Sequence, residues 1–208
     1  MLHSLCQEAD FYLQTFVRML TALDEYWGDD EAPPRWRQDL QLSSPIDPIA
    51  DFIPATLQDL NTIAVLRQTV WRSTYRGIHT DDMIDRFDFP WHNMHDRKKI
   101  LDPTFYVYLI DFSHEPVGYL IYQLKAETLL LHSLNLIPEA QRKGIGRAAL
   151  HHIRQFGRSH EMKEFQLQCN PWNRNAMDFY HAMGGRPFRE DLGNKERYMD
   201  AIWFSFSI

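Results

Sequence analysis

The stretch Leu134–Leu150, LNLIPEAQRKGIGRAAL, decides how the rest of the chain is interpreted. An apolar strand runs into Pro138, a short polar turn follows, and a helix is predicted over residues 146–160. Two glycines, Gly144 and Gly146, allow the backbone of this turn to approach a ligand closely. The first N–H groups of a helix have no partners inside the helix, and together with the helix dipole they attract anions. The stretch therefore predicts an anion site between a strand and a helix.

The charge around this loop supports the same interpretation. From Gln141 to Arg158 the chain carries five basic and no acidic residues, although its formal net charge is −6. Arg142, Lys143 and Arg147 stand at the turn itself, so a pyrophosphate is the expected anion. The loop is neither a Walker A loop nor a Rossmann loop, because it lacks both GxxxxGK[ST] and the third glycine of GxGxxG. The alternative is a glycine-bearing turn followed by a solvated basic helix.

A second informative stretch, Asn170–Gly185, reads NPWNRNAMDFYHAMGG. Asn173 stands just before a helix predicted over residues 175–183, and Tyr180 follows two turns later on the same face. Asn173 is either a helix cap or a hydrogen-bond partner for a ligand amide. Tyr180 is either a core tyrosine or a phenol presented to a cleft. The residues alone leave both alternatives open.

The remaining pattern predicts a single domain preceded by an N-terminal extension. Residues 1–27 form an amphipathic helix and the proline-containing residues 28–50 a linker, so the domain spans residues 51–208. A strand over residues 52–55 precedes a helix that Thr56 and Asp59 begin as a capping box, and Thr80 caps a shorter helix over residues 81–87. Further strands are predicted at residues 105–111, 117–124, 128–137, 165–169 and 197–205. We therefore expect an α/β (α+β) fold with a mixed sheet and helices on both faces.

Composition excludes several classes of protein. An acidic chain with a pI of about 5.9 is not expected to bind nucleic acid. No basic start precedes an apolar run, and no apolar stretch is long enough for a membrane span. Cys6 and Cys169 form neither a disulfide framework nor a metal-ligand pattern, and His92 and His95 lack a carboxylate partner. We expect a cytoplasmic protein without a metal.

Taken together, the two stretches resemble the GCN5-related N-acetyltransferase (GNAT) superfamily. Gln141, Gly144 and Gly146 match its phosphate-loop pattern, Q/R-x-x-G-x-G/A. The closing pattern N-x-x-A-x-x-F-Y-x-x-x-G-F is matched by Asn173, Ala176, Phe179, Tyr180 and Gly184. The resemblance covers roughly residues 50 to 205, and it is most specific over residues 128–185. Two positions depart from it: Gly185 stands where Phe is common, and His132 where a Glu is often found.

The resemblance implies a GNAT-like, mostly antiparallel sheet and an acyltransferase that uses acetyl-CoA as cosubstrate. The acetyl group would pass directly to a primary amine of a small molecule or peptide in a ternary complex. The residues implied in acetyl-CoA binding are Leu134, Asn135, Leu136, Gln141, Arg142, Lys143, Gly144, Ile145, Gly146, Arg147 and Asn173.

The same resemblance implies catalytic roles for two residues. Tyr180 would protonate or hydrogen-bond the leaving thiolate, and His132 is the candidate base for the acceptor amine. Trp71, Tyr75 and Asp81 lie where this family often builds its acceptor site. Two alternatives remain: a non-catalytic acyl-CoA sensor on the same fold, and transfer of a longer acyl chain. The N-terminal helix has three interpretations, namely packing on the domain, building a homodimer, or covering the acceptor cleft.

Overall fold

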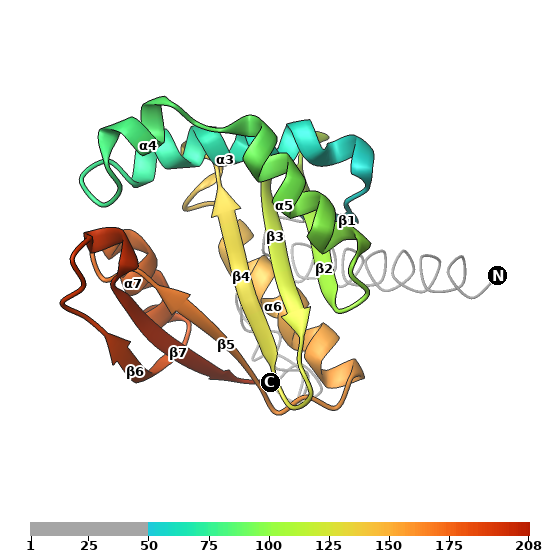
Figure 1. Cartoon of the computed structure of the whole chain (residues 1–208). Helices are drawn as coiled ribbons and strands as arrows, with labels where there is room; N and C mark the ends of the chain where they lie inside the picture. Colours follow the sequence, from blue (N-terminus) through green and yellow to red (C-terminus); the bar gives the residue numbers. More distant parts are fainter. Residues whose placement is uncertain (1–49) are drawn as a thin grey trace, which may run out of the picture. The chain divides into compact units, whose positions relative to one another are not determined.

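The computed structural model of the chain describes residues 50–208, and a seven-stranded sheet forms the centre of this part (Figure 1). The strands lie in the order β1-β2-β3-β4-β5-β7-β6. Neighbouring strands are antiparallel except β4 and β5, which are parallel. The strands are β1 (Asp51–Pro54), β2 (Phe105–Phe112), β3 (Glu115–Leu124), β4 (Leu129–Leu136), β5 (Glu164–Cys169), β6 (Arg186–Asp191) and β7 (Ala201–Ser207). The expected mixed, mostly antiparallel sheet is confirmed.

Helices cover both faces of the sheet, as the sequence pattern predicted (Figure 1). They are α3 (Leu60–Thr74), α4 (Asp81–Asp85), α5 (Phe89–Leu101), α6 (Ile145–Ser159) and α7 (Arg174–Ala182). On one face, Ile63 and Leu66 of α3 pack against Tyr119 and Ile121 of β3. On the other face, α6 and α7 pack in the larger core, which holds Ile145, Leu150, Ile153 and Tyr180. This division places α3 and α6 on opposite faces of the same strands.

The parallel pair at the centre of the sheet is short. The register pairs Leu129, Leu130 and Leu131 of β4 with Phe165, Gln166 and Leu167 of β5, and it extends no further. Beyond this point the two strands diverge (Figure 1). β5 continues to pair with β7, and β4 with β3. The C-terminal half of β4 therefore lies at an opening within the sheet.

A bulge in β4 stands at the start of this opening. Ile121 of β3 pairs with Ser133 and Tyr122 pairs with Leu131, which leaves His132 as the extra residue. A bulge bends its strand and raises the local twist. The position of His132 thus coincides with the place where β4 leaves β5.

Local signals predicted most of these elements. Thr56 and Asp59 form the expected capping box, although they begin a 3₁₀ turn (Leu57–Asp59) that leads into α3. Thr80 caps α4 by accepting a hydrogen bond from the N–H of Met83. The last strand begins later than predicted, at Ala201, because residues Arg197–Met199 form a 3₁₀ turn.

Two elements were not predicted, α5 and β6. Helix α5 buries the polar residues His92 and Asp96 and leaves Trp91, Met94 and Leu101 exposed, which is the reverse of an amphipathic pattern. Edge strand β6 is almost wholly exposed, so no alternation of apolar and polar residues marks it. Helix α5 is placed by its distant partner Arg67 of α3, and β6 by pairing with the following strand, β7.

The predicted helix over residues 1–27 and nearly all of the linker lie outside the described residues. Within residues 50–208, none of the helices combines the length and apolar character that crossing a membrane requires.

Candidate active site

The loop before α6 has the geometry of an anion site. Gly144 adopts φ of 83°, a left-handed conformation that glycine reaches without strain, and α6 begins at the next residue. The first helical hydrogen bond runs from the N–H of Ala148 to the carbonyl of Gly144, so the N–H groups of Ile145 and Gly146 precede it. Arg142 is exposed and also lies in the left-handed region, with φ of 61°. Loop shape, helix dipole and basic side chains all favour an anion here.

Close packing explains the second glycine of the loop. A Cβ at Gly146 would stand 3.1 Å from the ring of Phe179 on α7. The start of α6 and the middle of α7 therefore approach each other more closely than most side chains allow. The glycine loop and the segment Asn170–Gly185, the two stretches that match the family patterns, are therefore in direct contact.

Gln141 ties the loop to the open end of β4. Its side-chain amide donates to the carbonyl of Leu136 at 3.0 Å. Leu134, Asn135 and Leu136 lie beyond the last residue of β4 that pairs with β5. On the side of β4 that faces β5, the backbone N–H and C=O groups of these three residues do not pair with β5. They are therefore available to an extended ligand, in the way that the edge of a sheet can pair with a peptide.

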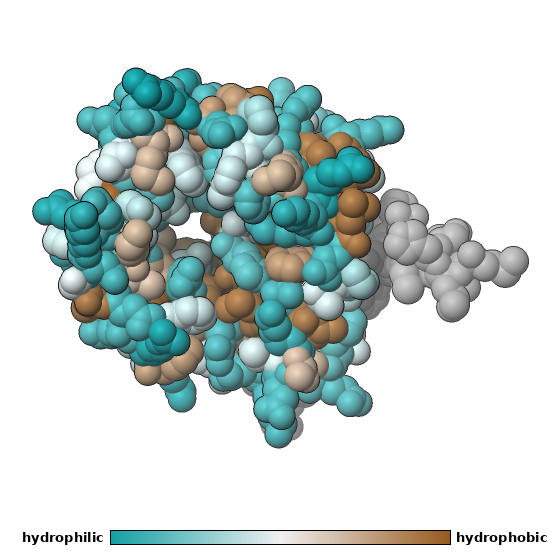
Figure 2. All heavy atoms as spheres, in the orientation of Figure 1, coloured by the Kyte–Doolittle hydropathy of each residue, from teal (hydrophilic) through white to brown (hydrophobic). Residues whose placement is uncertain are grey.

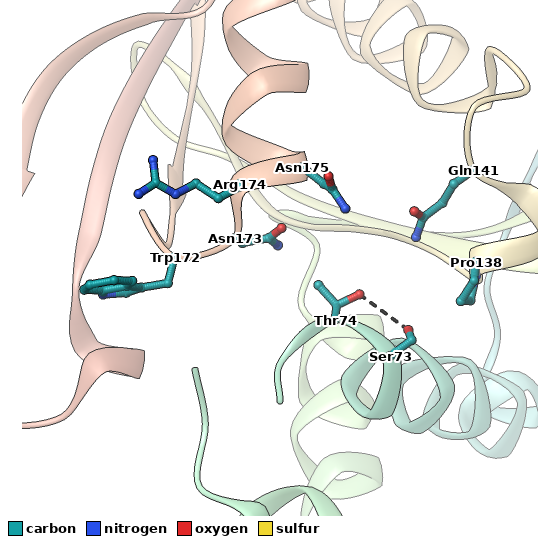
Figure 3. A pocket seen from close by; sticks show the side chains of 8 residues that line it. All are labelled: Ser73, Thr74, Pro138, Gln141, Trp172, Asn173, Arg174 and Asn175. Carbon is teal, nitrogen blue, oxygen red and sulfur yellow. Dashed lines mark hydrogen bonds between the residues drawn. The ribbon is translucent and has the colours of Figure 1, made fainter. Parts of the chain in front are cut away.

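A cleft of about 290 Å³ lies at this opening. It is lined by Ser73, Thr74, Pro138, Gln141, Trp172, Asn173, Arg174 and Asn175. Figure 3 shows the end of α3, with Ser73 and Thr74, facing the amides of Asn175 and Gln141 across the cleft. Figure 2 shows the same face of the molecule hollowed between the part that holds β4 and the part that holds α7. Of the residues implied by resemblance, Gln141 and Asn173 lie in the lining.

Asn173 serves the fold and the cleft at once. Its side chain caps α7 by accepting a hydrogen bond from the N–H of Ala176 at 3.2 Å. It also interacts with the Tyr75 phenol: burial raises the pKa of Tyr75 to about 12, and a hydrogen bond with Asn173 opposes that rise. Of the two alternatives for Asn173, the helix cap is confirmed. Its place in the cleft lining is compatible with a hydrogen bond to a ligand amide, which stays a prediction.

Tyr180 is the buried residue of α7; it lies in the larger core and is not among the residues that line the cleft. It is 9% exposed and packs against the rings of Phe179, Phe204 and Phe206. Burial raises the pKa of the Tyr180 phenol, and the neighbouring Cys169 thiol and Tyr75 phenol add to the rise. The phenol is therefore protonated at neutral pH and can act as a hydrogen-bond donor.

Two of the three expected acceptor residues, Trp71 and Tyr75, lie together at the end of α3. The ring of Trp71 contacts those of Tyr75, His79, Phe87 and His92, at centroid distances from 4.8 to 6.0 Å. Asp81, by contrast, is exposed and pairs with the Arg76 guanidinium at 3.0 Å. The structure thus groups Trp71 and Tyr75 in one aromatic cluster, with Asp81 outside it.

His132 lies outside the lining of the cleft. It is exposed on β4, where its Nε2 is 3.2 Å from the Gln123 amide oxygen and its ring is 5.1 Å from that of Phe105. Desolvation, with the ammonium groups of Lys99 and Lys125, lowers the pKa of His132. At neutral pH the ring is uncharged and a weaker base than an ordinary histidine.

A buried polar network beside the site was missed by sequence reasoning. The Arg67 guanidinium donates to the Tyr119 phenol at 2.9 Å, to Nδ1 of His92 at 3.0 Å and to the Asp96 carboxylate at 3.1 Å. The Asn135 amide also donates to the Tyr119 phenol, at 2.8 Å. This network joins α3, α5 and β3 to the open end of β4. A charged residue on an apolar helix face, as Arg67 is, was the one local signal for it.

Trp172 was also missed, although it stands next to Asn173. Its side chain lines the cleft, and its indole N–H donates to the Asp200 carboxylate at 3.4 Å. Asp200 also accepts from the backbone and side chain of Asn194, both at 3.0 Å. The Arg197 guanidinium covers the Trp172 ring at 4.5 Å. The loop over residues 192–200 is thereby fastened beside the cleft.

Histidine, cysteine and acidic side chains do not gather into a metal site in residues 50–208. Nδ1 of His92 accepts from Arg67, and Nδ1 of His95 is 2.7 Å from the carbonyl of Trp91. These two histidines therefore have structural partners.

Comparison with known proteins gives the family and the fold. The sequence profile of the acetyltransferase (GNAT) family matches residues 64–184. Among solved structures, the chain is similar to the PaiA N-acetyltransferase from Thermoplasma acidophilum in complex with coenzyme A, with a TM-score of 0.65 and 17% identity over 76% of this chain and 99% of that one. It is also similar to an acetyltransferase from Thermus thermophilus (TM-score 0.61, 21% identity, 76% and 97% covered). A third similar structure is the ribosomal-protein-S18-alanine N-acetyltransferase from Escherichia coli (TM-score 0.59, 17% identity, 77% and 94% covered).

Proposed function

Because the chain belongs to the acetyltransferase (GNAT) family, we propose that it transfers the acetyl group of acetyl-CoA to a primary amine of a small molecule or peptide. The observation that carries the proposal is the opening between β4 and β5, which leads to the glycine loop at the start of α6. An extended chain that ends in a pyrophosphate matches both features. The strand edge suits the amide-bearing arm, and the loop suits the phosphates.

In this proposal the backbone of Leu134–Leu136 holds the pantetheine arm, and the residues from Gln141 to Arg147 hold the pyrophosphate. Asn173 contributes a side-chain contact from the opposite wall, where it already faces the cleft. Backbone N–H groups near the end of β4 polarise the thioester carbonyl, a contact that stabilises charge developing on that oxygen.

Tyr180 completes the transfer by stabilising the leaving thiolate. An ordinary phenol has a pKa near 10 and a thiol one of about 8.5, so full proton transfer is uphill by roughly 2 kcal/mol. Burial raises the pKa of Tyr180 further. Hydrogen-bond donation during departure of the thiolate is therefore the role that suits this phenol, and the CoA thiolate takes its proton from solvent after the C–S bond has broken.

The acceptor amine must also lose a proton before it attacks. His132 is the candidate base on β4, at the position where the family often has a Glu, and it is neutral at pH 7, as a base must be. Because His132 is not among the residues that line the cleft, its role as a base needs a direct test, which a His132→Gln variant provides. An unaltered pH–rate profile in that variant would remove His132 from the mechanism.

Calorimetric titration of the full chain with acetyl-CoA, and with desulfo-CoA, tests the proposal. We expect the wild type to bind in the micromolar range and Gly144→Val to weaken binding at least about 100-fold, or about 2.8 kcal/mol. Gly193→Val is the matched control, because Gly193 also has a positive φ, 77°, but lies outside the glycine loop that precedes α6. A wild type that does not bind acetyl-CoA would overturn the proposal. Equal weakening by both variants would attribute the loss to general destabilisation.

Turnover is measured next, by release of the CoA thiol in the presence of spermidine, free lysine or a peptide with an N-terminal alanine. Acetylation of any of these amines supports an enzyme. Tight binding of acetyl-CoA with no turnover on any amine would favour the non-catalytic sensor on the same fold.

A further inference from the structure

Tyr119 of β3 carries a buried phenol that joins two other elements. Its oxygen accepts a hydrogen bond from Nε of Arg67 on α3 at 2.9 Å and another from the side-chain amide of Asn135 on β4 at 2.8 Å. Tyr119 is 1% exposed, and Arg67 is buried beside it. Hydrogen bonds that are shielded from water hold their partners more firmly than exposed ones do. The phenol therefore fixes Asn135 relative to α3.

Helix α5 holds the other side of this arrangement. The Arg67 guanidinium donates to Nδ1 of His92 at 3.0 Å and to the Asp96 carboxylate at 3.1 Å. A guanidinium is planar, and its five N–H groups point in fixed directions. Once two edges of the group are bound to α5, the direction of Nε toward Tyr119 is set as well. The position of the phenol thus depends on contacts from two helices.

The end of β4 that carries Asn135 has lost one of its two neighbouring strands. Its pairing with β5 stops at Leu131, while its pairing with β3 continues to Leu136. At this point β3 and β4 approach each other closely, because a Cβ at Gly118 would stand 2.2 Å from the Asn135 carbonyl oxygen. Asn135 is therefore held against β3 twice, by the backbone at Gly118 and by the phenol of Tyr119.

The residue after Asn135 offers a backbone donor to the opening. The N–H of Ile137 donates to the Val117 carbonyl of β3 at 2.9 Å. Successive residues of an extended strand direct their N–H groups to opposite edges, so the N–H of Leu136 is directed away from β3, toward the opening. The Leu136 carbonyl accepts from the side chain of Gln141, which lines the cleft. Among the backbone donors near the end of β4, the Leu136 N–H therefore suits the thioester carbonyl.

We propose that Tyr119 is a positioning residue for the acetyl transfer: by holding the side chain of Asn135, it directs the neighbouring N–H of Leu136 at the thioester oxygen. The inference rests on the proposed acetyl transfer. Negative charge develops on that oxygen only in the transition state, so the direction of the donor matters more for the rate than for binding. Tyr119 acts through Asn135 and does not touch the reacting atoms.

A role in stability alone makes a different prediction. Tyr119→Phe removes the acceptor of two buried donors, so it should lower the melting temperature whether or not Tyr119 serves catalysis. Only the positioning role predicts that the folded variant, with acetyl-CoA bound, also transfers the acetyl group more slowly. The rate is therefore measured at a temperature where circular dichroism shows every variant to be folded.

Tyr122→Phe is the matched control for Tyr119→Phe. Tyr122 also lies on β3 and is fully buried, but it belongs to the core on the opposite face of the sheet. Its phenol is 3.4 Å from that of Tyr108 and has no contact with Asn135 in the described part of the chain. Each variant of the full chain is saturated with acetyl-CoA and mixed with the amine, among spermidine, lysine and the alanine peptide, that the wild type acetylates fastest. The single-turnover rate is recorded, and calorimetry gives the Kd for acetyl-CoA.

We expect the single-turnover rate of Tyr119→Phe to fall about 10- to 30-fold, less than the roughly 100-fold or more that loss of an oxyanion donor costs. The Kd for acetyl-CoA should stay within about threefold of the wild-type value. Tyr122→Phe should keep the wild-type rate. Because Tyr119 acts through Asn135, the double variant Tyr119→Phe, Asn135→Ala should be no slower than the slower of the two single variants.

A slow Tyr119→Phe with acetyl-CoA affinity retained, together with losses that do not add in the double variant, supports the proposal. A wild-type rate in Tyr119→Phe overturns it, and so do equal losses in Tyr119→Phe and Tyr122→Phe. Losses that add in the double variant also overturn it, since the two residues would then act separately. A rate loss matched by an equal loss of acetyl-CoA affinity would show that the binding site as a whole is damaged, which contradicts it too. A wild type without acetyl-CoA binding or turnover overturns the proposed function itself, a result distinct from an active wild type with unaffected variants.

Discussion

The segment from β4 to α7 and the segment from α3 to α5 both contribute residues to the cleft, but they leave different signals in the sequence. The first, residues 129–185, presents backbone: an open strand edge and the start of a helix, shaped by glycines at fixed spacing. The second, residues 60–101, presents side chains such as Arg67, His79 and His92 that meet partners from distant segments. Backbone recognition leaves a local pattern in the sequence, whereas a site assembled from distant side chains does not. We call these, after the roles proposed for them, the cofactor segment and the acceptor segment.

The largest effect is expected from breaking the buried ion pair of the acceptor segment. Asp96→Ala leaves the Arg67 guanidinium buried without its carboxylate, which should lower the free energy of unfolding by about 3–5 kcal/mol. Asp82→Ala removes an exposed pair with Arg86 and should cost about 0–1 kcal/mol. Urea denaturation measures both. Similar losses in the two variants would show that the buried network does not stabilise the acceptor segment.

An intermediate effect is expected where the cofactor segment departs from its family pattern. A Cβ at Gly185 would stand 2.5 Å from the Phe206 ring, so Phe206 of β7 occupies the space that a side chain there would need. Restoring the common residue with Gly185→Phe should therefore destabilise the protein by about 1–3 kcal/mol. Thermal denaturation checks the single variant and its combination with Phe206→Leu. If the double variant loses as much stability as the two single variants together, or more, Phe206 does not occupy the space that a side chain at residue 185 needs.

A smaller effect is expected from the hydroxyl of Tyr180. Tyr180→Phe keeps the ring in the core and removes only the hydroxyl, which we propose to donate to the leaving thiolate. We expect kcat to fall tenfold or more, about 1.4 kcal/mol or more, with little change in the KM for acetyl-CoA. Steady-state kinetics at saturating amine measures it. Unchanged turnover would leave Tyr180 as a core residue of the cofactor segment.

The last effect concerns the acceptor segment and is confined to acid pH. Burial, with the Arg67 guanidinium, lowers the pKa of His92 from 6.5 to about 4 in the folded protein. Between these values the unfolded chain binds the proton more readily, so stability is complete above about pH 6.5 and declines as the pH falls toward 4. His92→Asn, whose amide oxygen can accept from Arg67, should weaken this decline in melting temperature. An identical decline in the variant would show that other groups control it.

The cofactor segment was largely predictable because its requirements are local. A glycine at positive φ, a helix start beside basic residues, and an asparagine cap two turns before a tyrosine are all visible within a few residues. The predictions for α6, α7 and the strands around them are therefore confirmed to within a few residues. The catalytic roles proposed for Tyr180 and His132 stay predictions.

The acceptor segment was predictable only in part. Thr56 and Thr80 marked the starts of their elements through side-chain caps, which are local. Helix α5 escaped because its buried face carries His92 and Asp96, whose partner Arg67 lies in another helix. No periodicity of apolar residues can report a polar face that is buried by a distant guanidinium.

The sequence by itself determined the glycine loop, the family resemblance and the strands and helices other than α5 and β6, because these depend on backbone conformations that each residue allows or forbids. Only the tertiary structure decided that β4 leaves β5 after Leu131, that Phe206 fills the space beside Gly185, and that His79 lies between Trp71 and Tyr198. These facts depend on which segments the folded chain brings together. Packing between side chains that are distant in the sequence depends on the whole folded domain, and no short stretch of residues predicts it.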